Sequence, residues 1–79
     1  MATEEECKEL ARQLGQTFSN LAFDVWERAD RAGEYYVAVI SIDFKTPDLK
    51  PHLPLEWWVT DWVNQDQRAM TCMICRGEP

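Results

Sequence analysis

Residues 34–44 read Glu-Tyr-Tyr-Val-Ala-Val-Ile-Ser-Ile-Asp-Phe, and this stretch decides the fold. Tyrosine, valine and isoleucine favour extended backbone, and a glycine directly before the stretch is typical of a turn. Side chains alternate between the two faces of a strand, so one face is apolar throughout. That face consists of Tyr36, Ala38, Ile40, Ile42 and Phe44. We expect a strand here, with this apolar face covered by a helix.

The residues before this strand have the periodicity of a helix. Thr3 and Glu6 have the spacing of a capping box, in which each side chain accepts a hydrogen bond from the other residue's backbone N–H. Apolar residues then recur at intervals of three and four over residues 7–29. A bend between Gly15 and Asn20 is compatible with the sequence. The three- and four-residue spacing of apolar residues continues without a break across these positions, however. We therefore predict one helix over residues 4–32 that extends beyond the sheet on which it packs.

Phe23 lies off the main apolar stripe of this predicted helix. It belongs to residues 21–26, in which Asp24 is the one polar residue. A helix that is apolar on nearly all sides is usually buried on more than one side. We therefore expect Phe23 either to pack against another part of the chain or to belong to a self-association or partner surface.

Pattern and composition disagree over residues 55–63. As a helix, this segment has a regular apolar stripe of Leu55, Trp58, Val59, Trp62 and Val63. Tryptophan, valine and threonine prefer strands, however, and residues 64–67 would then form a hairpin turn. We prefer the helix because of its pattern. Three prolines make residues 45–55 a loop, and residues 68–76 are expected to form the last strand.

The expected fold is therefore α+β, with the long helix packed on a small antiparallel sheet. The order is helix–strand–helix–strand, or helix–strand–strand–strand if residues 55–63 form a strand. A length of 79 residues indicates a single small domain over residues 1–79. The 46% of hydrophobic and 28% of charged residues are typical of a globular domain.

Charge and targeting signals restrict the partners. The chain has 14 acidic and 8 basic residues and a formal charge of −6, which argues against direct nucleic-acid binding because phosphate contacts depend on Lys and Arg. No apolar run is long enough to span a membrane, and the acidic first residues predict no signal peptide. We expect a cytoplasmic protein that binds neither membrane nor nucleic acid.

The three cysteines, an odd number, favour free thiols in a reducing compartment. Cys72 and Cys75 form a Cys-x-x-Cys pair, but residues three apart on a strand point to opposite faces. A zinc site could combine this pair with Cys7 and His52, although no second ligand pair supports it. We expect small buried side chains and no metal or cofactor, with a thiol or zinc protein as an alternative.

Catalytic motifs are missing from the sequence. It contains no glycine-rich phosphate loop, no Gly-x-Ser-x-Gly turn and no His-Glu-x-x-His pair. One histidine and three glycines leave few groups for acid–base chemistry or nucleotide binding. We therefore expect a protein that is not an enzyme.

Acidic residues divide into a paired and an unpaired set. On the predicted helix, three acids are followed four residues later by a base, which is the stabilising orientation. These pairs are Glu4/Lys8, Asp24/Arg28 and Glu27/Arg31. The acids without such partners are Glu5, Glu9, Asp30, Glu34, Asp43, Asp48, Glu56, Asp61 and Asp66, and the last five recur about every five residues from the end of the strand onward. Such a surface would attract a basic partner.

Tryptophans supply the second part of the predicted surface. Trp26 and at least two others are expected to fill the core, but neither structure for residues 55–63 hides all three clustered rings. An exposed tryptophan beside polar residues is typical of an interaction hot spot, and Trp57 is the leading candidate. The predicted partner-binding residues are Trp57, Trp58, Trp62, Asp61, Asp66, Glu56 and Phe23.

In size and composition the chain resembles small acidic inhibitors of basic protein sites, such as phage anti-defence proteins and immunity proteins. The likeness covers no alignable segment. It implies a non-enzymatic module that occludes a basic, nucleic-acid-handling site on a partner protein. The alternative is a structural homo-oligomer, a homodimer for example, assembled through the overhanging helix or a sheet edge.

Overall fold

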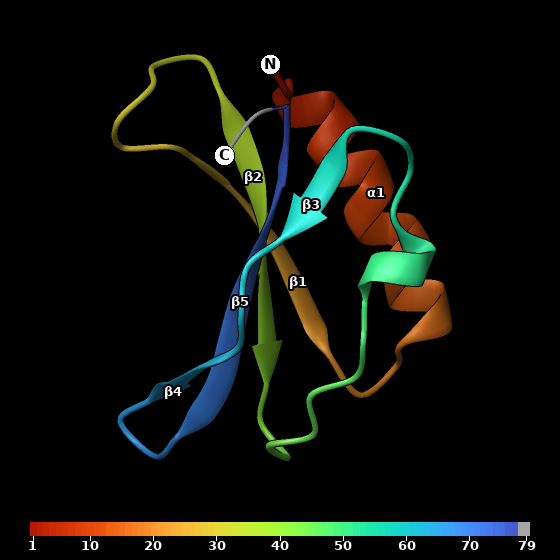
Figure 1. The fold of residues 1–79 in the computed structure, drawn as a ribbon, viewed down its shortest axis with the longest axis vertical. Helices are drawn as coiled ribbons and strands as arrows, with labels where there is room; N and C mark the ends of the chain where they lie inside the picture. The colour runs from red at the N-terminus through yellow and green to blue at the C-terminus, as the bar shows by residue number, and fades with distance from the viewer. Residues whose placement is uncertain (78–79) are drawn as a thin grey trace.

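A computed structural model describes residues 1–77, which form one helix packed on a five-stranded antiparallel sheet (Figure 1). This arrangement confirms the α+β class. The elements are α1 (Glu4–Thr17), β1 (Ala22–Glu27), β2 (Tyr35–Ser41), a 3₁₀ turn (Lys50–His52), β3 (Trp57–Val59), β4 (Val63–Gln65) and β5 (Ala69–Arg76). The strand order is β1-β2-β5-β3, and β4 also pairs with β5. Within residues 1–77, no helix has the length and apolar character needed to cross a membrane.

α1 ends at Thr17, so the prediction of one helix over residues 4–32 is wrong beyond that residue. The predicted capping box of Thr3 and Glu6 is present at its start. Phe18 then leaves helical backbone, with φ −117° and ψ 79°, and a turn leads into β1. With 14 residues, α1 extends about 21 Å and lies within a molecule whose longest dimension is 31 Å. The long overhang predicted for a helix over residues 4–32 is therefore not formed by the described residues.

The apolar spacing of β1 explains this error. Phe23 and Val25 pack against the core, whereas Asp24 and Trp26 are exposed, so the segment also fits an alternation of period two. Phenylalanine, valine and tryptophan favour strands, and β1 pairs with β2 along its whole length. Residues 22–27 therefore form a strand, although their apolar spacing also fits a helix, because the strand pairs with β2.

α1 covers the face of β2 opposite to the predicted one. Val37 and Val39 are fully buried in the core with Leu10 and Leu14 of α1. The prediction counted residues up to Phe44 as strand positions, but β2 ends at Ser41. Ile42 and Phe44 therefore lie beyond the strand and do not belong to either of its faces. Without these two residues, the predicted face is no longer the more apolar one.

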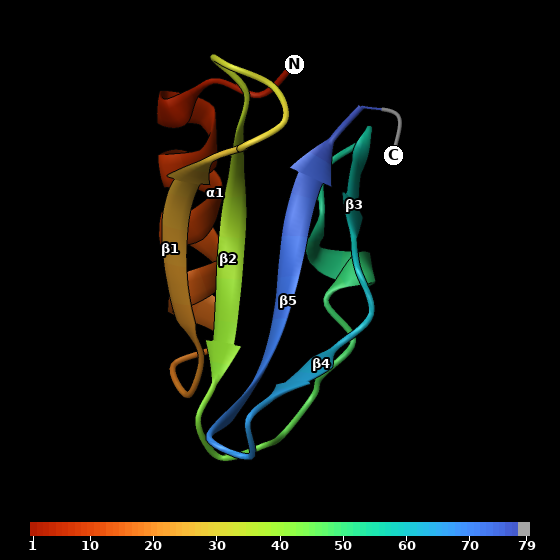
Figure 2. The ribbon, with the colours of Figure 1, turned by 90° about the vertical axis from the view of Figure 1, so that its left-hand side faces the viewer.

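The loop after β2 completes the core on the side of α1. Figures 1 and 2 show it beside β5 and β3, next to the helix. Leu49, from the predicted proline-rich loop, is buried, and Leu53 packs against the same cluster. The loop and α1 together cover one face of the sheet.

Residues 55–63 contain strand β3, so the helix preferred for this segment is wrong and the strand alternative is correct. Between the pairs Val59–Ile74 and Val63–Thr71, three residues of one strand oppose two of β5. This is a β-bulge. At the bulge, the Thr60 N–H donates to the Met73 carbonyl (2.9 Å), and the Thr60 hydroxyl accepts from the Met73 N–H (2.8 Å). The extra residue reverses the alternation of side chains between β3 and β4.

Candidate protein-binding face

The predicted surface residues do not gather on one face. Phe23, Trp57 and Trp62 point toward α1 and the loop and pack against the core. Trp58 points to the opposite side of the sheet, because it pairs with Cys75. Trp57 and Trp62 share a side although they are five residues apart, because the bulge lies between them.

Trp57 and Trp62 are held by contacts within the chain. The guanidinium of Arg76 lies over the Trp57 ring, 5.5 Å from its centroid. The indole N–H of Trp62 donates to the Pro47 carbonyl at 3.4 Å. Both rings are half-buried, so each serves the packing of the loop and helix.

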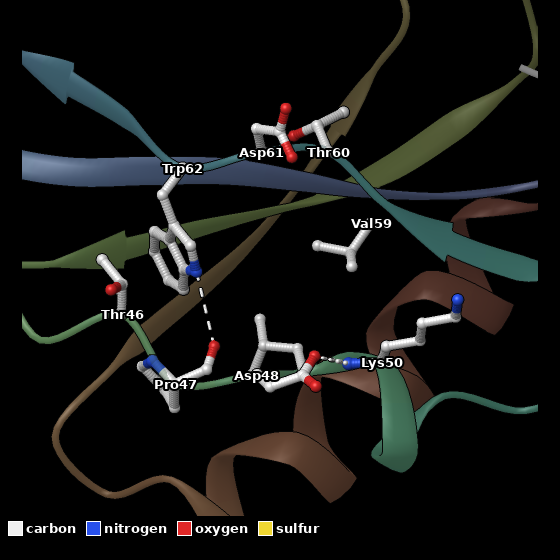
Figure 3. Close-up of a pocket in the computed structure, with 9 residues that line it drawn as sticks. Thr46, Pro47, Asp48, Lys50, Val59, Thr60, Asp61 and Trp62 are labelled. Carbon is white, nitrogen blue, oxygen red and sulfur yellow. Dashed lines mark hydrogen bonds between the residues drawn. The ribbon is translucent and has the colours of Figure 1, made fainter.

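A cavity of about 320 Å³ lies between the bulge and the loop that crosses it. Figure 3 shows Val59 and Trp62 on the strand side and Pro47 and Asp48 on the loop side. The Asp48 carboxylate accepts a hydrogen bond from the Lys50 backbone N–H at 3.1 Å. The Trp62 indole N–H donates to the Pro47 carbonyl across the cavity. These hydrogen bonds hold the loop in place. We therefore interpret the cavity as a gap left where the loop packs on the strand, and not as a binding site.

The predicted acidic residues of this region lie in turns and in the bulge. Asp66 and Gln67 have φ of 52° and 61°, and the Arg68 N–H donates to the Gln65 carbonyl, which defines a type I′ hairpin turn. Glu56 has φ 76° in the turn before β3. Asp61 is exposed in the bulge. The hairpin turn thus accounts for Asp66, because Asp tolerates a positive φ, whereas the turn geometry gives no reason for a glutamate at position 56.

Ion pairing among the described residues leaves the five acids Asp43, Asp48, Glu56, Asp61 and Asp66 unneutralised, as predicted. The same prediction is wrong for Glu5, Glu9, Asp30 and Glu34, which form salt bridges with nearby bases. Within residues 1–77, salt bridges join acids of α1 and of the β1–β2 turn to nearby bases, whereas seven other carboxylates have none. These seven are Asp24, Glu27, Asp43, Asp48, Glu56, Asp61 and Asp66. The predicted pairs Asp24/Arg28 and Glu27/Arg31 are absent from the described residues because β1 is not helical.

The face of the sheet that α1 does not cover carries an aromatic and apolar surface, which we call the open face. Figure 2 shows this side of the sheet toward the viewer, with α1 behind β1 and β2. Strand registers arrange its residues in three rows across the strands. The rows are Trp26–Tyr36 with Cys75–Trp58, whose Tyr36 and Cys75 line one hollow, then Asp24–Ala38–Met73 and Ala22–Ile40–Thr71–Val63.

Trp26 is the outstanding residue of the open face. Its side chain is 55% exposed, although the sequence predicted it in the core. Its indole N–H donates to Oδ2 of Asp24 at 2.7 Å, and Oδ1 of Asp24 accepts from the Val25 backbone N–H at 2.9 Å. One carboxylate therefore fixes the exposed ring. The signal for this residue was the period-two alternation of residues 22–27.

Two hollows lie side by side on the open face, and Tyr36 and Met73 line both. One, of about 230 Å³, is mainly apolar and has Ala38 among its lining residues. The other, of about 250 Å³, contains the ion pair of Arg28 and Asp30. An apolar hollow next to charged groups is typical of a surface that accepts side chains of a partner.

The cysteines are buried and separated. Cys72 pairs with Val39 in the core, and Cys75 lies on the other side of the sheet. Burial raises the pKa of Cys7 to about 11 and that of Cys72 to about 12, and it also raises the pKa of Cys75. Among residues 1–77 no three His, Cys, Asp or Glu side chains are placed to share a metal ion. The predicted set of Cys7, His52, Cys72 and Cys75 is therefore not assembled.

Comparison of the chain with protein-family models, with curated proteins and with solved structures gives no match in any of the three. The open face is therefore the feature of the molecule from which a function can be inferred.

Proposed function

We propose that this chain is a non-enzymatic, cytoplasmic binding module whose open face docks on a protein with a basic surface and occludes it. The observation that carries the proposal is the exposed Trp26 ring held by Asp24. Ordering a side chain on binding costs free energy, and a ring already fixed in the free protein avoids that cost. A fixed, exposed tryptophan has the properties of an interface anchor.

The apolar content of the open face supports a protein partner. Besides Trp26, large side chains of Met73 and Val63 on this face are 43% and 56% exposed. Contiguous exposed apolar side chains on a small protein mark an interaction surface more often than an inert one. Flanking polar groups, such as the Gln65 amide at the hollow, match the polar rim of protein interfaces.

The charge distribution favours a basic partner over a second copy. Seven carboxylates without an ion pair, Asp24 among them, remain within residues 1–77. Two copies of a chain with formal charge −6 repel each other, whereas a basic surface is attracted and correctly oriented. Of the seven carboxylates, Asp24 lies on the open face, so a basic group of an unlike protein suits this face better than a second copy does.

The outer edge of β1 supports docking on the face instead of strand addition. Edge strands expose backbone groups that can pair with another chain. Here the Asp24 carboxylate occupies the Val25 N–H and brings a negative charge to the edge. A strand added at this edge would have to displace that hydrogen bond.

The test compares three immobilised proteins: wild type, Trp26→Ala and Leu55→Ala. Leu55 is 91% exposed in the turn before β3, so its removal deletes apolar surface away from the open face. Each protein is exposed to a lysate of the natural host, and retained proteins are quantified by mass spectrometry. The candidates are then purified, and their affinity for the three proteins is measured by calorimetry at several salt concentrations.

We expect a basic protein that wild type and Leu55→Ala bind alike, and that Trp26→Ala binds at least tenfold more weakly. Its affinity should fall as salt increases. A partner that binds all three proteins equally, or a salt-independent affinity, would contradict the proposal.

A further inference from the structure

We propose that the hollow over Ala38 is a socket for one bulky apolar side chain of the partner, and that a Lys or Arg next to this anchor pairs with Asp24. This inference rests on the proposed function and deepens it, because it names the recognition element. The structural reason is the position of a small residue at the centre of the open face.

Ala38 lies in the middle row of the open face, between Asp24 of β1 and Met73 of β5. Its neighbours on the same face of β2 are Tyr36 and Ile40, both much larger. A methyl side chain surrounded by larger ones leaves a depression. The hollow of about 230 Å³ is this depression, and Trp26 forms part of its wall.

The lining determines which side chain fits. Trp26, Tyr36, Ile40 and Met73 supply aromatic, aliphatic and thioether surface, so burying an apolar group there removes apolar area from water on both sides. Methionine adapts its shape to different partners and makes favourable contacts with aromatic rings. A Phe, Leu, Met or Trp side chain therefore matches the socket.

Asp24 adds the charged part of the recognition. Its carboxylate accepts two hydrogen bonds, from Trp26 and Val25, but a carboxylate has about four acceptor positions. Within residues 1–77 no Lys or Arg pairs with it. Because Asp24 and Ala38 are direct cross-strand partners, a cation adjacent to the anchor would reach this carboxylate.

Two matched substitutions isolate the socket. Ala38→Phe fills the hollow, and phenylalanine is a good strand residue, so the fold should tolerate it. Leu55→Phe adds the same ring at an exposed position in the turn before β3, outside the open face. Asp24→Asn removes the charge and retains an amide oxygen. Circular dichroism melting curves verify that each variant is folded.

The experiment pans a phage-displayed library of random peptides on immobilised wild type, without prior selection against any variant. We expect enriched peptides that combine a bulky apolar residue with Lys or Arg within two positions. Synthetic copies should bind wild type and Leu55→Phe alike, and bind Ala38→Phe at least tenfold more weakly. The affinity for Asp24→Asn should be reduced and less sensitive to salt.

Enriched peptides that lack this pairing, or that bind Ala38→Phe as they bind wild type, would overturn the socket. If such peptides still lose affinity for Trp26→Ala, the open face binds and only the socket is wrong. If Trp26→Ala also has no effect, the proposed function fails with it. Dimerisation of wild type that Ala38→Phe abolishes, measured by light scattering, would instead assign the socket to a second copy and overturn the proposal.

Discussion

The Asp24 carboxylate and the Trp26 indole are joined by a 2.7 Å hydrogen bond on the exposed face of an edge strand. The two residues are neighbours on the same side of β1, as the period-two alternation of a strand requires. The same carboxylate accepts the Val25 N–H, so it both restrains the ring and occupies the outer edge of the sheet. This contact prepares an exposed aromatic side chain for binding before a partner arrives.

Loss of this carboxylate should loosen the ring without unfolding the protein. In Asp24→Ala, we expect the Trp26 indole N–H resonance to move upfield and its ¹⁵N order parameter to fall. The free energy of unfolding should change by less than about 1 kcal/mol, because the Val25 N–H and the Trp26 indole N–H can both donate to water instead. Asp61→Asn, which alters another exposed carboxylate, is the control and should leave the Trp26 signal unchanged. An unchanged Trp26 signal in Asp24→Ala would show that the hydrogen bond does not order the ring.

Acid stability should depend on the contact that joins the start of α1 to the end of β5. Glu6 accepts from the Arg76 guanidinium, with Nη2 to Oε1 at 3.0 Å, and from the Thr3 backbone N–H. The bonds from Arg76, and then those from Thr3, lower the pKa of Glu6 from 4.5 to about 2. The unfolded chain therefore takes up this proton at higher pH than the folded one. The contribution of Glu6 is complete above about pH 4.5 and is lost as the pH falls toward 2.

Melting temperatures of wild type and Glu6→Gln, measured from neutral pH down to pH 2, test this dependence. The difference should be constant at neutral and weakly acidic pH and vanish near pH 2. Glu5→Gln, in the same helical turn, should follow the wild-type curve. A difference between wild type and Glu6→Gln that does not vary with pH would refute the role of the charge.

Trp58 and Trp57 should respond oppositely to replacement by phenylalanine. The Trp58 indole N–H is buried without an acceptor among residues 1–77, and an unsatisfied buried donor costs about 1–3 kcal/mol. Trp58→Phe should therefore leave the free energy of unfolding equal to wild type or raise it by about 1 kcal/mol. Trp57→Phe should lower it by about 1 kcal/mol, because the ring packs on the core and under Arg76. Urea denaturation measures both, and a clear loss in Trp58→Phe would contradict this account.

The three thiols should be unreactive in the folded protein. All are buried, and burial raises the pKa of each, so little thiolate is present at neutral pH. Dithionitrobenzoate should label the native chain only as fast as it unfolds, and should label all three cysteines in guanidinium chloride. Rapid labelling of Cys72 or Cys75 in the native state would revive the thiol hypothesis.

The sequence predicted those features that local chemistry determines. The capping box of Thr3 and Glu6, the strand at β2, the proline-rich loop and the last strand are all present. Each depends on residues close in the chain, whose preferences agree with the final fold. The unpaired acids after β2 were also identified, since no Lys or Arg follows any of them at the three- or four-residue spacing of a helical ion pair.

The features that the sequence did not predict depend on tertiary pairing. Residues 22–27 fit both a helix and a strand, and pairing with β2 decided between them. The bulge at Thr60 changes which tryptophans share a face, and no turn residue marks it in the sequence. These two changes moved the candidate surface from Trp57 and Trp62 to Trp26 and the open face.

The most direct test of the central claim is an NMR footprint. The ¹⁵N-labelled chain is titrated with the purified partner obtained from the capture experiment, and amide and indole signals are followed. We predict that Trp26, Tyr36, Ala38 and Met73 shift or broaden first, while α1 and the loop at residues 46–50 remain unchanged. Perturbation confined to α1 or to that loop, with the open face unaffected, would contradict the account.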